Sequence, residues 1–291
     1  MDTSNASVPD TIFTEAPDRK VSGIRRPAVS GYFYPADAER LERAIEAATP
    51  RHAARRAAQA VIVPHSSYDR CGEILGSVFG RITIPRRCMI VGPSHAGSWL
   101  PWSVLGAGQY RTPLGNVPVE APLAQALRRA CPFLPAEEWS QEGEHAIEVV
   151  LPFLQRFGPS DLSIVPVLAG SDDADELCHF TAALAEVVRG AGEPMLLIAS
   201  TDLTHFQPLD QALVQDRQLI DRLCALDDAG LIRDVQGRGG SMCGYGAAAA
   251  VIGAARALGA QQGTLTRYAT SAEAEGDPDS VIGYAGIIID G

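Results

Sequence analysis

His65, His95 and His205 each stand a few residues after a run of apolar side chains that reads as a buried strand. In an open α/β sheet the carboxyl ends of the strands meet at one edge, and ligands bind there. Neutral imidazole is the commonest metal ligand, and its pKa near neutrality also suits it to proton transfer. One such histidine is usually an ordinary hydrogen-bonded loop residue. Three of the chain's six histidines at equivalent strand ends instead predict a shared site.

Other side chains with suitable chemistry lie near these positions. Asp202 follows the third of the apolar runs, and His145 follows Glu144 at the start of an expected helix. An acid at that place could simply be a first-turn residue favoured by the helix dipole. Cys243 lies beside Gly244, just before a segment of small residues. A cysteine at a helix start is expected to have a lowered thiol pKa, although most free cysteines are inert packing residues.

The remaining signals mainly exclude functions. The glycine-rich pieces form neither a dinucleotide-binding fingerprint nor a phosphate-binding loop, and no nucleophile elbow is present. His52 and His179 adjoin no predicted strand end, and we expect both to be incidental.

Strand and helix signals alternate along the chain. The expected strands cover residues 60–64, 88–92, 162–168, 194–199, 263–270 and 281–289. The expected helices cover residues 37–48, 73–81, 123–130, 145–157 and 173–189, with two or three more between 210 and 259. Glycines and prolines between 102 and 119 indicate a hairpin-like excursion. This alternation predicts one α/β domain over residues 27–291, with a largely parallel sheet flanked by helices, after a mobile tail at 1–26.

Composition narrows the setting. The chain has 291 residues, 46% of them hydrophobic, and a formal net charge of −11. Such a charge repels phosphate backbones, so we expect no nucleic-acid partner. The sequence contains no apolar run near the roughly 18 residues of a membrane span and no secretory signal, which predicts a cytoplasmic protein without membrane contact. The six cysteines show no paired spacing, and we expect them to be reduced.

Seven short motifs follow one another along nearly the whole expected domain. They are Gly-Tyr-Phe-Tyr-Pro at 31–35, Pro-His-Ser-Ser-Tyr at 64–68, Gly-Pro-Ser-His at 92–95, Thr-Pro-Leu-Gly at 112–115, Glu-His-Ala-Ile-Glu at 144–148 with Leu-Pro at 151–152, Ser-Thr-Asp-Leu-Thr-His at 200–205, and Met-Cys-Gly at 242–244. In this ordered set the chain resembles the MEMO family (mediator of cell motility), whose bacterial members are also called AmmeMemoRadiSam system protein B.

The resemblance carries expectations about fold and site. The family is similar in structure to the class III extradiol ring-cleavage dioxygenases, which are non-haem iron enzymes. This implies a mixed central sheet flanked by helices, with a pocket at one edge. The implied metal ligands are His65, His95 and Cys243. The implied further pocket residues, with catalytic roles, are His145, Asp202 and His205. The chain departs from the family pattern at Ser66-Ser67, where Ala-Gly is more frequent.

A thiolate among the implied ligands changes the expected metal. Iron oxygenases of this general type use two imidazoles and one carboxylate. Sulfur is a softer donor than oxygen, so copper(I) and zinc compete better with iron(II) at such a site. Iron or copper is therefore the expected cofactor, and zinc also fits.

Three functions remain open at this point. The first is a metal-dependent oxidoreductase, in which the second group of residues moves protons and orients ligands. The second is a non-enzymatic pocket protein that binds a peptide or a small ligand, with a structural metal or none. The third is a zinc-type hydrolase in which the metal activates water. The oligomeric state is left open.

Overall fold

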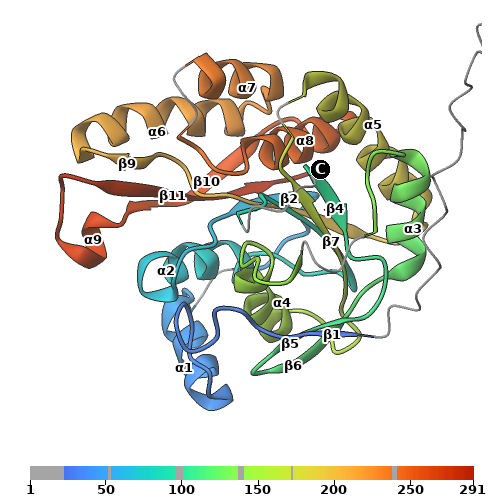
Figure 1. Ribbon diagram of the computed structural model, residues 1–291. Helices are drawn as coiled ribbons and strands as arrows, with labels where there is room; N and C mark the ends of the chain where they lie inside the picture. Colours follow the sequence, from blue (N-terminus) through green and yellow to red (C-terminus); the bar gives the residue numbers. More distant parts are fainter. Residues whose placement is uncertain (1–22, 52–53, 96–100, 137–140, 172, 238–240) are drawn as a thin grey trace, which may run out of the picture.

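The computed structural model describes residues 23–51, 54–95, 101–136, 141–171, 173–237 and 241–291. Within these residues one large mixed sheet forms the centre of the molecule (Figure 1). Its strands are β2 (Ala60–Val63), β3 (Arg87–Gly92), β4 (Trp102–Val104), β7 (Ser163–Ala169), β8 (Met195–Ser200), β9 (His205–Gln207), β10 (Gly263–Thr270) and β11 (Val281–Ile289). The strands lie in the order β10-β11-β2-β8-β3-β7-β4, with β9 paired to β11.

The middle of this sheet is parallel and its margins are antiparallel. Strands β2, β8, β3 and β7 pair in parallel, whereas β4, β9, β10 and β11 join by antiparallel pairing. Parallel neighbours need long crossover connections, and helices supply them here. The structure confirms the predicted α/β class with a mixed central sheet, but only its four central strands are parallel.

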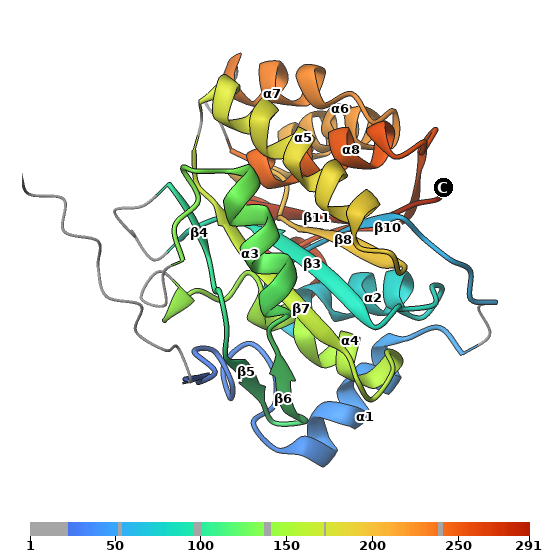
Figure 2. The same cartoon turned by 90° about the vertical axis from the view of Figure 1, so that its right-hand side faces the viewer.

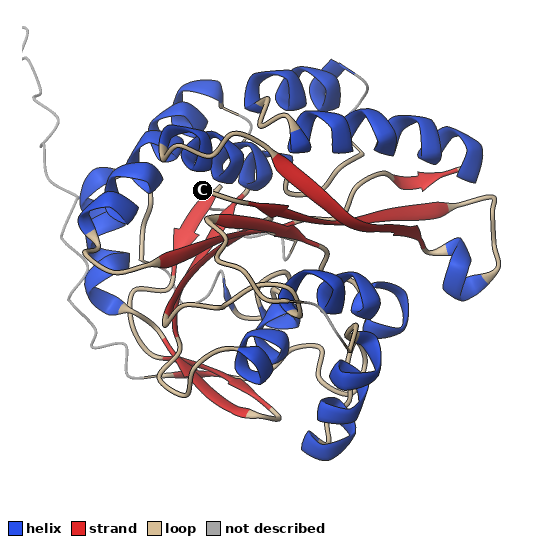
Figure 3. Ribbon diagram, turned by 180° about the vertical axis from the view of Figure 1, so that it is seen from behind, coloured by secondary structure: helices blue, strands red, loops and turns tan. Residues whose placement is uncertain are grey.

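Helices cover both faces of the sheet (Figures 1 and 3). On one face lie α1 (Ala38–Ala48), α2 (Tyr68–Phe79) and α4 (Leu151–Phe157), the last preceded by the short 3₁₀ helix η2 (Glu148–Val150). On the other face lie α5 (Ala174–Gly190), α6 (Leu209–Cys224), α7 (Asp228–Gly237) and α8 (Tyr245–Ala257). Helix α3 (Ala121–Ala130) packs beside β7 and α5, as Figure 2 shows, and the short α9 (Ala272–Glu275) connects β10 to β11.

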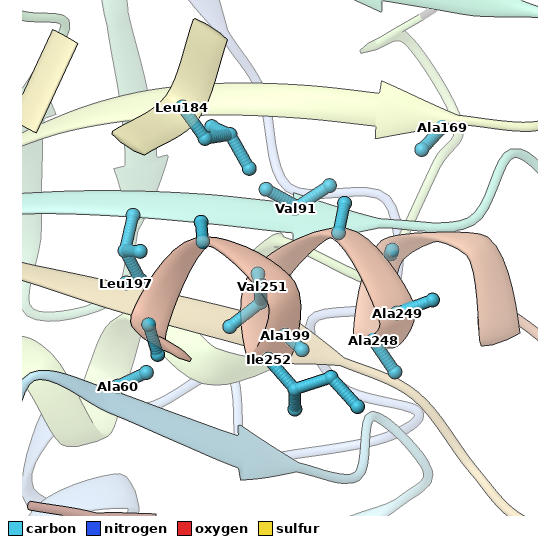
Figure 4. Close-up of a cluster of buried hydrophobic side chains, with 14 of the residues drawn as sticks. Ala60, Val91, Ala169, Leu184, Leu197, Ala199, Ala248, Ala249, Val251 and Ile252 are labelled. Atoms are coloured by element: carbon cyan, nitrogen blue, oxygen red, sulfur yellow. The ribbon is translucent and has the colours of Figure 1, made fainter. Parts of the chain in front are cut away.

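The two faces enclose two apolar cores because successive strand residues point to opposite sides. In β2, Ala60 and Ile62 belong to the core under α5 and α8, whereas Val61 and Val63 belong to the core under α1, α2 and α4. Helix α8 is apolar on every side and rich in alanine, as expected of a helix that is buried all round. Figure 4 shows its small side chains lying directly against the strands.

The predicted excursion between residues 102 and 119 is confirmed, and it forms a second, small sheet. Strands β5 (Gln109–Thr112) and β6 (Gly115–Pro118) make an antiparallel hairpin. Strand β1 (Ile24–Arg25) pairs in parallel with β5. Residues 1–22 of the tail predicted for 1–26 lie outside the described residues. The tail prediction is wrong for its last part, because β1 holds Ile24 and Arg25 in this sheet.

A buried ion pair holds β1 in place. The Arg25 guanidinium donates to the Glu148 carboxylate, and the two side chains are 4% and 0% exposed. Glu148 also accepts from the N–H groups of Ala28 (2.7 Å) and Val29 (3.0 Å) and from the Tyr34 hydroxyl (2.6 Å). These long-range partners cannot be read from a local sequence pattern.

Two helix starts differ from prediction. Helix α2 begins at Tyr68, earlier than the expected residue 73. The helix expected over residues 145–157 begins as η2 at Glu148 and becomes an α-helix only at Leu151. The main chain of His145 and Ala146 is held instead by side chains of the candidate site described below. No helix within the described ranges is long and apolar enough to span a membrane.

We predict that Glu148→Ala lowers the free energy of unfolding by about 3–5 kcal/mol, because it leaves the buried Arg25 charge without its partner. Glu39→Ala is the matched control. It removes a carboxylate from an exposed pair with Arg43 and should cost less than about 1 kcal/mol. Urea unfolding of both variants measures the difference. Equal stability losses would mean that the Arg25–Glu148 pair does not anchor β1.

Candidate metal centre

The three strand-end histidines lie at one edge of the large sheet. Strand β8 lies between β2 and β3 and is parallel to both, so the carboxyl ends of all three strands point the same way. His65 follows β2, His95 follows β3, and Asp202 follows β8. His205 begins β9, which returns along β11. The arrangement agrees with the rule that ligands bind at the carboxyl ends of parallel strands.

His65, His95 and Cys243 come together at this edge. One donor atom from each, an imidazole nitrogen or the thiol sulfur, lies within 4.8 Å of the others. The His65 Nε2 atom is 3.5 Å from Cys243 Sγ, and the rings of His65 and His95 are 5.1 Å apart between centroids. Two imidazoles and a thiol at this spacing could hold one metal ion.

The hydrogen bonds of His65 leave one ring nitrogen free for a ligand. The Ser200 hydroxyl donates its proton to the Ala146 carbonyl at 2.6 Å, so its oxygen must accept from His65 Nδ1 at 2.9 Å. His65 Nε2 therefore carries a lone pair that faces Cys243. Burial, followed by the neighbouring histidines, lowers the pKa of His65 well below its usual range. His65 is thus neutral, the form that binds metal ions.

Glu144 fixes the proton of His95 in the same way. Its buried carboxylate accepts from His95 Nδ1 at 3.0 Å and also from the His95 main-chain N–H. Burial opposes the charge, but the contacts with His95 and two main-chain N–H groups outweigh it and lower the pKa of Glu144 to about 2. An ionised carboxylate can only accept, so His95 Nδ1 carries the proton and Nε2 remains available. Burial also lowers the pKa of His95, but Glu144 outweighs it and the net direction is upward.

Glu144 and Ser200 were not recognised as site residues from the sequence. The sequence favours Glu144 as a first-turn acid, but the helix begins only with η2 at Glu148. Its carboxylate accepts instead from the N–H groups of His145 (2.8 Å) and Ala146 (2.9 Å) as well as from His95. Glu144 and Ser200 both stand within the quoted sequence motifs, next to or near His145 and Asp202. That closeness in the sequence is the signal by which they could have been found.

His145 completes a cluster of three imidazoles. Its ring stacks on that of His95 at 4.7 Å and meets that of His65 edge-on at 5.5 Å. Phe33 packs edge-on against its other side. Burial lowers the pKa of His145, and the charge of Glu144 offsets part of this effect. The His145 side chain is 22% exposed and that of His95 34%, whereas His65 is enclosed, so the cluster opens to solvent on one side.

Asp202 and His205 also lie close to Cys243. Donor atoms of these three residues also lie within 4.8 Å of one another, as do those of His95, Glu144 and His145. Asp202 accepts from the His65 N–H at 3.0 Å, and burial raises its pKa despite this hydrogen bond. His205 Nδ1 contacts the carbonyl oxygens of Leu203 (2.8 Å) and Ser241 (2.5 Å), so it carries a proton. Its Nε2 is left as an acceptor.

The expectation of a lowered thiol pKa at Cys243 is wrong. Burial, followed by the negative charge of Asp202, raises the pKa of Cys243. The helix offers little compensation, because Cys243 precedes the N-cap Gly244 of α8, which has a left-handed φ of 62°. The Asp202 N–H does donate to the sulfur at 3.3 Å. The thiol therefore becomes a thiolate only when a cation replaces its proton.

The other sequence expectations concern the surroundings of the site. Ser66, at the departure from the family pattern, is buried and accepts from the Tyr284 hydroxyl at 3.2 Å. His179 contacts the Ala130 carbonyl far from the three clustered imidazoles, and His52 lies outside the described residues. All six cysteines are free, as expected. Residues 96–100 and 238–240, which adjoin the site in the sequence, also lie outside the described residues.

Fold and site together define an α/β protein with a candidate histidine–cysteine metal centre at the carboxyl edge of its sheet. Comparison with known proteins is consistent with this class. The family model described as Memo-like protein matches residues 25–288. The MEMO1 family protein of Methanopyrus kandleri is 37% identical to this chain, over 91% of this chain and 98% of its own length. That of Methanothermobacter thermautotrophicus is 38% identical, over 90% of this chain and 99% of its own length. The chain belongs to the MEMO family.

A solved structure shows the same fold at greater distance. The crystal structure of an uncharacterized protein from Escherichia coli K12 superimposes with a TM-score of 0.54. The match covers 80% of this chain and 99% of the other, with 18% sequence identity. At that identity the likeness concerns the fold alone.

We predict that Glu144→Gln weakens metal binding by about ten- to a hundredfold, because the amide no longer fixes which His95 nitrogen carries the proton. Glu142→Gln is the control, since Glu142 is exposed and close by in the sequence. Competition titrations with a metal chelator measure both affinities, and thermal melting checks the fold. Unchanged affinity in the Glu144 variant would remove Glu144 from the candidate centre.

Proposed function

We propose that this chain binds a redox-active metal ion through His65, His95 and Cys243 and acts as a metal-dependent oxidoreductase. The observation that carries the proposal is that hydrogen bonds fix the ring nitrogens of His65 and His95 in the state that metal binding requires. Each imidazole has its Nδ1 atom occupied by a fixed acceptor, Ser200 for His65 and Glu144 for His95, so that its Nε2 atom is free. Ligating histidines in metalloproteins are oriented in this way by their second nitrogen.

The donor set indicates which ions fit. A soft thiolate with two imidazoles favours copper(I) or zinc over iron(II) more than a site with a carboxylate does. Asp202 nevertheless lies close, with Oδ2 3.9 Å from His65 Nε2, and a carboxylate oxygen suits iron(II). Iron or copper is the ion that we propose for redox chemistry. When bound, it would supply one-electron chemistry and an open coordination position for a small substrate.

The chain's own residues would bind the substrate and move its protons. His145 is neutral, partly exposed and stacked on His95, so it can accept a proton from a substrate that enters at the open side. Asp202 fixes the His65 main chain, and His205 Nε2 is available as a second proton acceptor. These roles match those of the pocket residues implied by the family resemblance. The kinship in fold with class III extradiol dioxygenases is part of the proposal and supports it by analogy only.

A second candidate is a pocket protein that binds a small molecule or a peptide without catalysis. The observation that favours it is Phe206, a bulky residue with a positive φ of 56° and a side chain that is 72% exposed. Its ring lies 5.8 Å from that of His205, at the margin of the site. Strained backbone persists where the surroundings enforce it, often at ligand sites, and an exposed aromatic ring there could contact a bound ligand.

Parallel metal analysis and oxygen consumption separate the two candidates. His65→Ala should lose the metal outright, because it removes a proposed ligand. His205→Ala should stay folded and metallated but lose most turnover, by roughly a hundredfold, because it removes a proton acceptor. Protein purified without chelators is assayed for metal content, thermal melting and oxygen uptake with catechols and with thiol reductants.

Each outcome of this experiment has a fixed meaning. A metallated wild-type protein that consumes no oxygen with any of these substrates contradicts the oxidoreductase proposal and favours the pocket protein. A His205→Ala protein without metal beside a fully loaded His65→Ala protein would reverse the ligand assignment.

We also predict that Cys243→Ser sharply lowers retention of copper and zinc but weakens iron retention less, because an alcohol is a poor ligand for soft metals. Cys71→Ser is the control, since Cys71 is also buried but donates to the Ser66 carbonyl and lies outside the three donor groups. Metal analysis after dialysis measures retention. If the Cys243 variant keeps all three metals as the wild type does, the thiol is a packing residue.

A further inference from the structure

We propose that a pocket remote from the candidate metal centre binds the phosphate group of a small organic phosphate. We call it the basic pocket, and its charged and aromatic lining consists of Arg43, Arg51, Arg55, Arg156, Glu46 and Phe157. Its volume is about 750 Å³. The proposal is independent of the metal chemistry, because no residue of this lining belongs to the three donor groups.

The fold places the basic pocket at the opposite end of the sheet from the imidazoles. Helix α2 begins just after His65, at the carboxyl end of β2, and runs to Phe79 before β3 starts. Helix α4 likewise follows the imidazole cluster and ends at Phe157 before β7 starts. The pocket is lined by residues at or just beyond the ends of α1, α2 and α4, each of which precedes a strand, so it lies toward the amino ends of the strands.

The basic pocket is positively charged, whereas the whole chain is negatively charged. Four arginines and one glutamate line it, whereas the chain carries a net charge of −11. Arg156 pairs with Glu46 at 2.7 Å, and Arg43 pairs with Glu39 at 3.6 Å. Within the described part of the chain, Arg51 and Arg55 have no carboxylate partner. Four guanidinium groups against one lining carboxylate give the pocket a net positive charge, which attracts an anion.

Phe157 organises two of these guanidinium groups. The Arg55 and Arg156 guanidinium carbons lie 5.1 Å and 5.6 Å from the centre of its ring. A guanidinium over an aromatic face is attracted to the ring and keeps its N–H donors along its edge, and those of Arg55 have no carboxylate partner within the described residues. That edge matches two oxygens of a phosphate group, which it can bind with two parallel hydrogen bonds.

The size of the basic pocket indicates more than inorganic phosphate. Pockets for small organic ligands commonly measure about 300–1,000 Å³, and this one falls within that range. Apolar and neutral groups that could contact the rest of a ligand come from Ala47, Thr49 and Pro50 at the end of α1. The chemistry therefore fits a small molecule that carries one or more phosphate groups.

Titration of inorganic pyrophosphate into the full chain tests the proposal, with calorimetry at low ionic strength after chelator treatment and dialysis. We expect saturable binding to one site. The double variant Arg51→Gln/Arg55→Gln should weaken it by roughly tenfold or more, because two charged donors to the phosphate oxygens are lost. Both residues are exposed, so folding should be unchanged by circular dichroism.

Two controls make the result specific. Arg217→Gln/Arg233→Gln removes the same charge from exposed positions on α6 and α7, across the sheet, and should bind pyrophosphate as the wild type does (Figure 1). His65→Ala should also bind it unchanged. The proposal is overturned if the wild type shows no saturable binding, if both double variants weaken binding equally, or if His65→Ala abolishes it and thereby assigns the anion to the metal centre.

Discussion

The arrangement of the candidate metal centre depends on one buried carboxylate, that of Glu144. It accepts hydrogen bonds from the ring and main chain of His95 and from the main chain at His145 and Ala146. A single ionised group thus sets the position of two loops and the proton of one imidazole. Such a group is stable in the interior only because every oxygen is satisfied. Removing one partner would leave the others facing an uncompensated charge.

The buried pair of Arg25 and Glu148 holds the segment that carries Glu144. Arg25 donates to the Glu144 carbonyl and to the Glu148 carboxylate, and its guanidinium lies 5.0 Å from the centre of the Tyr110 ring. Strand β1, the hairpin β5–β6 and the segment that carries His145 are therefore held together by polar contacts rather than by apolar packing alone. The parallel strands supply the other half of the arrangement, since they bring His65, His95 and Asp202 to the same edge of the sheet.

The sequence predicted those parts of the molecule that depend on local pattern. Runs such as 88–92 and 281–289 are apolar enough to be read as strands, and the carboxyl-edge rule then brought the histidines together. Partners such as Arg25 and Glu148 are separated by over a hundred positions and have no local signature. The same holds for the Ser200 hydroxyl that fixes the His65 proton. The pKa of Cys243 was mispredicted because burial, which depends on the whole fold, outweighs the position near a helix start.

The alanine-rich helix α8 has a mechanical consequence for the thiol. Its side chains are short where it lies on the strands, so the helix axis can approach the sheet closely (Figure 4). Cys243 is joined to the first turn of that helix through Gly244, whose missing side chain allows the main chain to pass Pro93 and the Ser200 carbonyl. The short side chains of α8 thus set the distance between the helix and the sheet, and with it the position of the Cys243 sulfur relative to the strand ends. A larger side chain at a buried position such as Ala248 would move the helix away from the strands, and the sulfur away from the imidazoles, without altering any donor atom.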